Sequence, residues 1–191
     1  MRKKFSKLGI FFISSLSLSY TGLAQANDFP TRDISVQVTF PPGGGTDLLA
    51  RMLGGPLGDS LGKAIVVENK PGASGNIAAR YVARARPDGH TLLMVNSSYA
   101  VNPAVFKNLP IDPSKDLKGV VNFAYVPLAL IVPADSPHSD IQSYLESAKN
   151  SDKAMFYGSC GNGTPQPFAG EYLNQVAEIS LVHVPYAGCG P

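Results

Sequence analysis

The sequence predicts an α/β fold with mostly parallel sheets. Segments with the alternating or β-branched pattern of strands take turns with segments that place apolar residues at helical spacing, an order typical of parallel sheets. A strand, a glycine-rich loop and a helix follow one another twice, about 120 residues apart. A third predicted strand, 91–96, is apolar throughout, as expected of a strand covered on both faces.

The first of these units predicts an anion site. A strand at 34–39 enters the run Phe-Pro-Pro-Gly-Gly-Gly-Thr-Asp at 40–47, and a helix is expected from about 46 to 61. The glycines allow close backbone approach, Thr46 or Asp47 is expected to cap the helix, and a helix N-terminus attracts anions. No Lys-Ser/Thr and no Gly-x-Gly-x-x-Gly is present, which favours a small carboxylate over a nucleotide. An ordinary strand–helix turn is the alternative.

The remaining elements follow in order. Gly54-Gly55-Pro56 predict a kink or two short helices within 46–61, and Pro-rich sequence from Asn102 indicates a linker. Further strands are expected at 64–68 (buried), 117–124, 126–132, 154–157 and 181–184, and helices at 76–85, 141–150 and 168–179. The loop 158–164 forms the second strand–loop–helix unit, so two such loops can hold one ligand from both sides of a cleft.

The N-terminus predicts export. A basic stretch at 1–7, an apolar run at 8–18 and Ala-Gln-Ala at 24–26 are typical of a cleaved secretory signal peptide over residues 1–26. Four of the 16 Lys and Arg residues lie in it and none of the 14 Asp and Glu residues does, so the formal charge of +2 turns negative on cleavage. We therefore expect a periplasmic protein without a nucleic-acid partner.

The two cysteines, Cys160 and Cys189, leave two possibilities open. An oxidising periplasm permits a disulfide, which would add on the order of 3 kcal/mol of stability. Two unrelated free thiols fit the sequence as well, and spacing does not decide between them.

Six motifs occur in an order typical of one known family. They are PPGGGTD, VVENKPGASGNIAA, ARPDGHTLLM, NPAVFKNLPIDPSKDL, YGSCGNGTPQPFAGE and HVPY. Over residues 29–186 the chain resembles the Bug receptors, the periplasmic solute-binding proteins of tripartite tricarboxylate transporters. The resemblance implies a monomeric, two-lobed Venus-flytrap protein without catalytic activity or cofactor, with 27–101 in the first lobe and 102–191 in the second. It also implies an inner-membrane transporter as partner.

The resemblance further implies that both glycine loops grip the carboxylate of a small organic acid or amino acid. Carried over by position, the ligand-binding residues are Gly43, Gly44, Gly45, Thr46 and Asp47 in the first loop, Ser97 and Ser98 after the third strand, and Ser159, Gly161, Asn162, Gly163 and Thr164 in the second loop.

Three departures from the family pattern stand out. Pro167 replaces a usual histidine, Ala-Gly-Cys follows Tyr186 in place of Lys-Gly, and the sequence stops at Pro191 where members continue for over about a hundred residues. The expectation is a truncated receptor whose second lobe and return to the first lobe are incomplete, and whose exposed sheet edges leave it marginally stable.

Two other functions remain open. A non-functional remnant of such a receptor would share every motif. A periplasmic hydrolase would use Ser74, Ser159 or Cys160 with His90, His138 or His183 as base, but none of these nucleophiles lies in Gly-x-Ser-x-Gly. No His/Cys/Asp cluster has the spacing of metal ligands.

Overall fold

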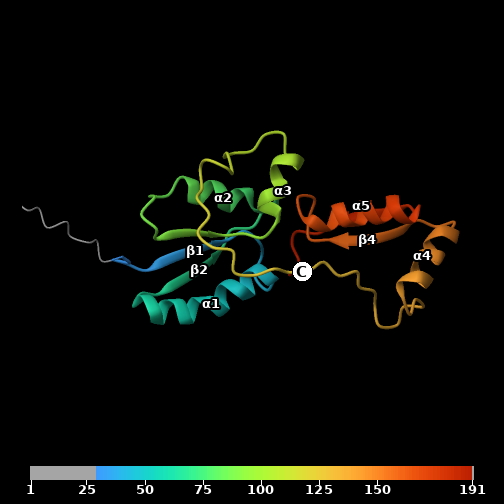
Figure 1. Ribbon diagram of the computed structural model, residues 1–191, viewed down its shortest axis with the longest axis horizontal. Coiled ribbons are helices and arrows are strands. Elements are labelled where there is room, and N and C mark those ends of the chain that lie inside the picture. The colour runs from blue at the N-terminus through green and yellow to red at the C-terminus, as the bar shows by residue number, and fades with distance from the viewer. Residues whose placement is uncertain (1–28, 191) are drawn as a thin grey trace, which may run out of the picture.

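The computed structural model describes residues 29–190, so the predicted signal peptide lies outside the described residues. Two parallel sheets organise the chain (Figure 1). The strands are β1 (Ile34–Val38), β2 (Ile65–Asn69), β3 (Thr91–Met94), β4 (Met155–Ser159) and β5 (Leu181–Pro185). The helices are α1 (Gly45–Leu61), the short 3-10 turn η1 (Ala73–Gly75), α2 (Asn76–Ala83), α3 (Ser98–Val105), α4 (Ile141–Asn150) and α5 (Pro165–Ala177). The predicted parallel α/β class is confirmed.

The first lobe is a three-stranded sheet in the order β2-β1-β3. Helix α1 covers one face and α2 the other (Figure 1). Val38 of the central strand is fully buried against Ala50 of α1 and Met94 of β3. Burying such apolar side chains is the main force that fixes the helices on the sheet.

Helix α1 runs without interruption from residue 45 to residue 61, so the expected division into two short helices is wrong. Gly58 serves packing, because a Cβ there would lie 3.1 Å from the carbonyl oxygen of Lys63, just before β2. Pro56 removes one helical hydrogen bond, the one to the carbonyl of Met52. Met52 is largely exposed, so water can satisfy that carbonyl.

The second lobe joins β4 and β5 to helices α4 and α5 (Figure 1). Its core forms around Tyr144 of α4, Leu181 of β5 and Ile179 between α5 and β5. Asp140 caps α4 by accepting the Ser143 N–H at 2.8 Å in a reciprocal capping box. This stabilises a helix that begins far from both glycine loops.

The segment between the lobes differs most from the sequence prediction. The expected strands at 117–124 and 126–132 are absent from the described structure, and the segment is neither helix nor strand. Val120, Tyr125 and Ile131 are 82%, 90% and 84% exposed. Their β-branched and aromatic character predicts strands, but strand preference depends on a neighbouring strand, and β4 pairs only with β5.

Two smaller expectations also need correction. The second strand, β2, is an edge strand whose alternate residues are exposed, so it is not buried as expected. Helix α3 runs through Asn102, where a linker was expected to begin, and so crosses the position expected to divide the lobes. Among residues 29–190, no helix is both long and apolar enough to cross a bilayer.

We expect Ile131→Thr combined with Val126→Thr to increase the fraction of soluble protein that is not aggregated, because both side chains lie in the exposed segment. The free energy of unfolding should change by less than about 0.5 kcal/mol, as for other surface substitutions. Light scattering and urea unfolding measure the two effects. Val38→Thr, which puts a hydroxyl into the core, is the matched control and should cost about 1–3 kcal/mol. If the double variant lost as much free energy of unfolding as Val38→Thr, the segment would have to pack in a core.

Candidate functional site

Two glycine-rich loops begin where β1 and β4 end. We call residues 40–47 the first loop, residues 159–164 the second loop, and residues 186–190 the return segment. The carboxyl ends of parallel strands, with helix N-termini beside them, are the usual place for ligands in α/β sheets. The N–H of Gly163 in the second loop donates to Ser74 Oγ of the first lobe at 3.1 Å, so the second loop lies at the junction of the lobes.

Asp47 organises the first loop. Its carboxylate accepts the Gly43 N–H at 2.9 Å, Arg51 Nε at 3.0 Å and Asn69 Nδ2 at 2.9 Å. Asn69 Nδ2 also donates to the Phe40 carbonyl at 3.0 Å, and Asn69 Oδ1 accepts a hydrogen bond from Arg51 Nη2 at 2.9 Å. The side chain of Asp47 is only 3% exposed. It therefore fixes the loop from inside and does not present its charge to a ligand.

These contacts change the acidity of Asp47. The hydrogen bond from Arg51 lowers its pKa most, and the Gly43 N–H and Asn69 add to this against the opposing effect of burial, so the pKa falls to about 2. The carboxylate is therefore charged at every physiological pH. Each hydrogen bond to the charged form favours that form.

The expectation that Thr46 or Asp47 caps α1 is wrong. The N-cap residue is Gly44, and no side chain caps it. Asp47 lies within the first turn and reaches back to Gly43, so it completes the loop before the cap. Helix α5 likewise begins after Thr164 without a side-chain cap. Helix α1 therefore begins with backbone N–H groups that no capping side chain occupies, whereas Pro165 and Pro167 leave Gln166 as the one N–H donor among the first three residues of α5.

The polar side chains of the second loop also serve its shape. Thr164 Oγ1 donates to the Gly161 carbonyl at 2.6 Å, and Ser159 Oγ accepts the Gly161 N–H at 3.1 Å. Ser159 Oγ also lies 2.6 Å from His183 Nε2 of β5. Ser159 and Thr164 are buried. Both hydroxyls are therefore engaged inside the loop, whereas Asn162 is exposed.

The Ser159–His183 contact does not have the environment of a hydrolase dyad. Among residues 29–190, no carboxylate hydrogen-bonds to His183, whose ring instead stacks on Tyr157 at 5.1 Å. A reacting serine needs an accessible hydroxyl and an oriented base. Cys160 is bonded in a disulfide. The geometry favours a structural role for this contact.

The other proposed bases lie elsewhere. His90 is buried between Thr31, whose N–H donates to Nε2 at 3.1 Å, and Asp88. His138 packs against Tyr144 in the second lobe. Ser74, the remaining nucleophile candidate, meets Gly163 and no histidine.

A disulfide between Cys160 and Cys189 settles the question that the sequence left open. The two Cα atoms lie 4.8 Å apart. The bond attaches the return segment to the second loop, while the same segment packs on the first: a Cβ on Gly190 would lie 2.7 Å from the Pro42 carbonyl oxygen and 3.5 Å from Gly44 N. One short segment therefore touches both loops.

Ser97 and Ser98 begin α3 after the third strand. Ser97 is exposed, whereas Ser98 is buried and its hydroxyl has no partner among the described residues. Sequence reasoning missed Arg51 and Asn69, which fix the first loop, and Asn102, which holds Ser74. The spacing of four between Asp47 and Arg51 could have indicated the first of these, and Asn69 stands directly after a strand. Nothing in the sequence pattern singles out Asn102.

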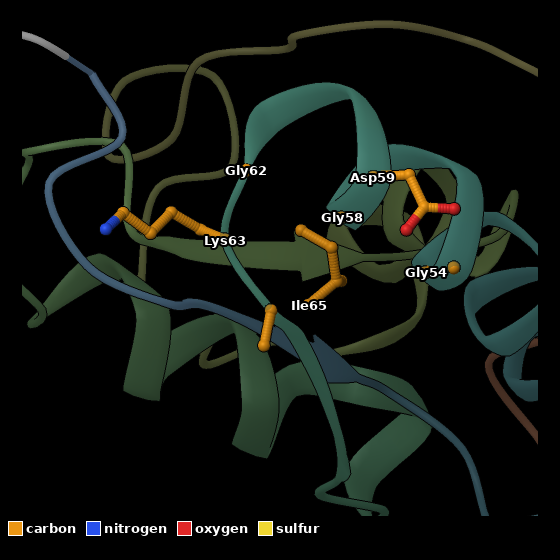
Figure 2. A pocket seen from close by; sticks show the side chains of 8 residues that line it. Gly54, Gly58, Asp59, Gly62, Lys63 and Ile65 are labelled. Atoms are coloured by element: carbon orange, nitrogen blue, oxygen red, sulfur yellow. The ribbon is translucent and has the colours of Figure 1, made fainter.

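Figure 2 shows a shallow pocket on the outer side of the first lobe, between α1 and the start of β2. It is lined by Gly54, Gly55, Gly58, Asp59, Gly62, Lys63, Ala64 and Ile65. The hollow results from glycines that carry no side chains. None of the predicted ligand-binding residues lines it, and we assign it no role in binding.

Comparison with known proteins now identifies the family. Residues 49–191 match the tripartite tricarboxylate transporter family receptor. The chain belongs to this family. It is 40% identical to a UPF0065 protein from Bordetella bronchiseptica over 88% of this chain and 50% of that protein. It spans about half the length of the curated relatives it matches.

Two solved structures of similar fold carry ligands in their names. An R. palustris protein with adipate has a TM-score of 0.81 at 33% identity, over 84% of this chain and 54% of that one. MatC from Rhodopseudomonas palustris, with bound malate, has a TM-score of 0.67 at 30% identity, over 85% and 56%. Structural neighbours of this kind confirm the periplasmic-binding-protein fold.

Replacing Asp47 by Asn should lower the free energy of unfolding by about 2 kcal/mol at pH 7, because a group with a depressed pKa stabilises the fold while it is charged. The contribution is fully present above about pH 4 and is lost as the pH falls towards 2. Urea unfolding at several pH values measures it. Asp88 and Asp112 also have pKa values lowered to about 2. Their contributions to the free energy of unfolding are the same in both proteins and therefore cancel when the two are compared. A difference that does not shrink below pH 4 would contradict this role.

Removing the disulfide with Cys160→Ser and Cys189→Ser should cost about 3–4 kcal/mol, as expected when a closed loop of 29 residues is opened. Reduction of the unaltered protein should give the same loss of thermal stability. Added reductant should leave the melting of the double variant unchanged. A reductant effect on that variant would assign the loss to another cause.

Proposed function

We propose that the chain forms the part of a periplasmic receptor that carries both glycine loops, and that these loops bind the carboxylate of a small organic acid for delivery to a tripartite transporter. Membership of the receptor family supports this, as do relatives named with adipate and malate. The observation that carries it is that the return segment touches both loops, bonded to the second through the disulfide and packed on the first at Pro42 and Gly44, while Ser74 contacts the second loop from the first lobe.

The helix N-termini give this proposal its chemistry. Helices α1 and α5 start at the two loops without a side-chain cap, whereas α4, which starts elsewhere, has a full capping box. The uncapped N–H groups of α1, the N–H of Gln166 in the first turn of α5 and the two helix dipoles attract a carboxylate without any arginine. Asp47 and Arg51 fix the donors of the first loop in advance, so binding needs little ordering of the backbone.

Within this proposal the residues have different roles. Backbone groups of Gly44, Gly45 and Thr46, together with exposed Asn162 and Ser97, contact the acid. The remaining predicted residues, Gly43, Asp47, Ser98, Ser159, Gly161, Gly163 and Thr164, shape the loops around it.

The proposed receptor acts as a monomer in the periplasm after removal of residues 1–26. Its division into lobes at about residue 101 and its transporter partner belong to the same proposal. The rival possibilities are a remnant that binds nothing and, without support from the Ser159–His183 geometry, a hydrolase.

Thermal unfolding of residues 27–191 with adipate, malate and other small carboxylates tests the proposal. A ligand at 100 times its dissociation constant should stabilise the native state by about 2.7 kcal/mol. Gly45→Ala should weaken binding at least about tenfold, because its methyl group would stand over the N-terminus of α1, where the Cβ position is open.

Gly55→Ala is the matched control. Its Cβ position is also open and it lies in the same helix, but away from the loop. It should bind the acid like the unaltered protein and be slightly more stable, because Ala favours a helix over Gly. A cooperative melt that no acid raises would leave the remnant interpretation standing.

A further inference from the structure

A single hydrogen bond joins the first lobe to the second loop among residues 29–190. The N–H of Gly163 donates to Ser74 Oγ at 3.1 Å, across a sequence separation of 89 residues. Ser74 belongs to η1, the turn between β2 and α2. Among residues 29–190 no histidine hydrogen-bonds to its hydroxyl, so it has no base that would make it a nucleophile. Its hydroxyl faces the other lobe.

Asn102 of α3 holds Ser74 in place. Its Nδ2 donates to the Ser74 carbonyl at 3.0 Å and to Asn76 Oδ1 at 3.1 Å. A backbone carbonyl can only accept, so the amide nitrogen must face Ser74. The Oδ1 atom then lies on the side of Gly163, where no described hydrogen bond satisfies it, although Asn102 is only 1% exposed.

Ser74 occupies a conformation that favours glycine. Its φ is 52° and its ψ is 36°, in the left-handed region. A side chain in that region is strained. Glycine occupies positions 72 and 75 of the same turn, but position 74 carries a serine. A serine at this position supplies a hydroxyl at the cost of strain.

Gly163 shows the complementary feature. A Cβ there would lie 2.6 Å from both Cβ and Oγ of Ser74 and 2.8 Å from Asn102 Oδ1. Its own φ lies outside the left-handed region, unlike that of Gly161, so the backbone at 163 accepts any residue. The close approach of the first lobe is therefore what requires glycine here.

We propose that Ser74 and Asn102 are positioning residues that hold the second loop, through Gly163, in its binding position against the first lobe. This rests on the proposed function, since the loop so positioned is the one assigned to the carboxylate. When the lobes separate, the Gly163 N–H and Asn102 Oδ1 pass to water. Closure on a ligand restores the contact, which therefore slows release of the acid.

Amide hydrogen exchange in the full chain tests the contact without a ligand. In protein labelled with ¹⁵N-glycine, Ser74→Ala should speed exchange of the Gly163 N–H about fivefold or more, as expected for the loss of one hydrogen bond. The exchange rate of the Gly55 N–H in α1 reports global stability and should not change. Ser60→Ala, an exposed serine on α1, is the control. Unchanged exchange at Gly163 in Ser74→Ala would overturn the proposal.

Ser74→Gly separates the hydroxyl from the strain. It removes both, so it should speed exchange at Gly163 as Ser74→Ala does, even if it makes the protein more stable. Exchange like that of the unaltered protein would overturn the role of the hydroxyl.

Stopped-flow binding of the acid that raises the melting temperature tests the consequence. Ser74→Ala should increase the dissociation rate about fivefold with little change in the association rate, and Gly163→Ala should increase it further. Equal dissociation rates in all variants would overturn the proposal. If no acid binds the unaltered protein, the proposed function fails, while the exchange at Gly163 still decides whether the contact exists.

Discussion

The hydrogen-bonded cluster around Asp47 is the constraint on which the first loop depends. Three donors from three segments converge on one buried carboxylate, and Asn69 ties the end of β2 to the carbonyl of Phe40. A buried charge is costly unless its partners are complete. The loop can therefore open only by breaking several bonds at once, which keeps the first turn of α1 aimed at the junction.

The second loop obtains its shape differently. Its hydroxyls satisfy neighbouring backbone groups, the disulfide fixes Cys160, and Gly163 rests on the first lobe. The hydrogen bonds that shape the first loop thus lie within its own lobe, although the return segment also packs on this loop, whereas the second loop is held partly by the first lobe. When the lobes move, the second loop gives up its hydrogen bond to Ser74, while the hydrogen bonds that shape the first loop can be kept.

Local patterns were enough to predict the parallel sheets, both glycine loops and helix α4 at its observed bounds. They failed where distant residues decide the outcome. The segment 117–132 has strand composition but has no neighbouring strand, and α1 continues through Pro56 and packs Gly58 against the start of β2. Ser74 and Asn102 are the clearest case, since their role depends on contact with Gly163 of the other lobe.

The contacts that shape the two loops come from a few segments of the fold. Every contact that shapes the first loop comes from residues 40–69 or from the return segment, and the second loop uses residues 159–186, Ser74 and Cys189. The exposed apolar side chains gather in the segment before α4 and on both α1 and α5. Solved relatives align with the chain over little more than half of their length. The loop geometry is therefore formed within the shared half, while exposed apolar side chains remain on both lobes.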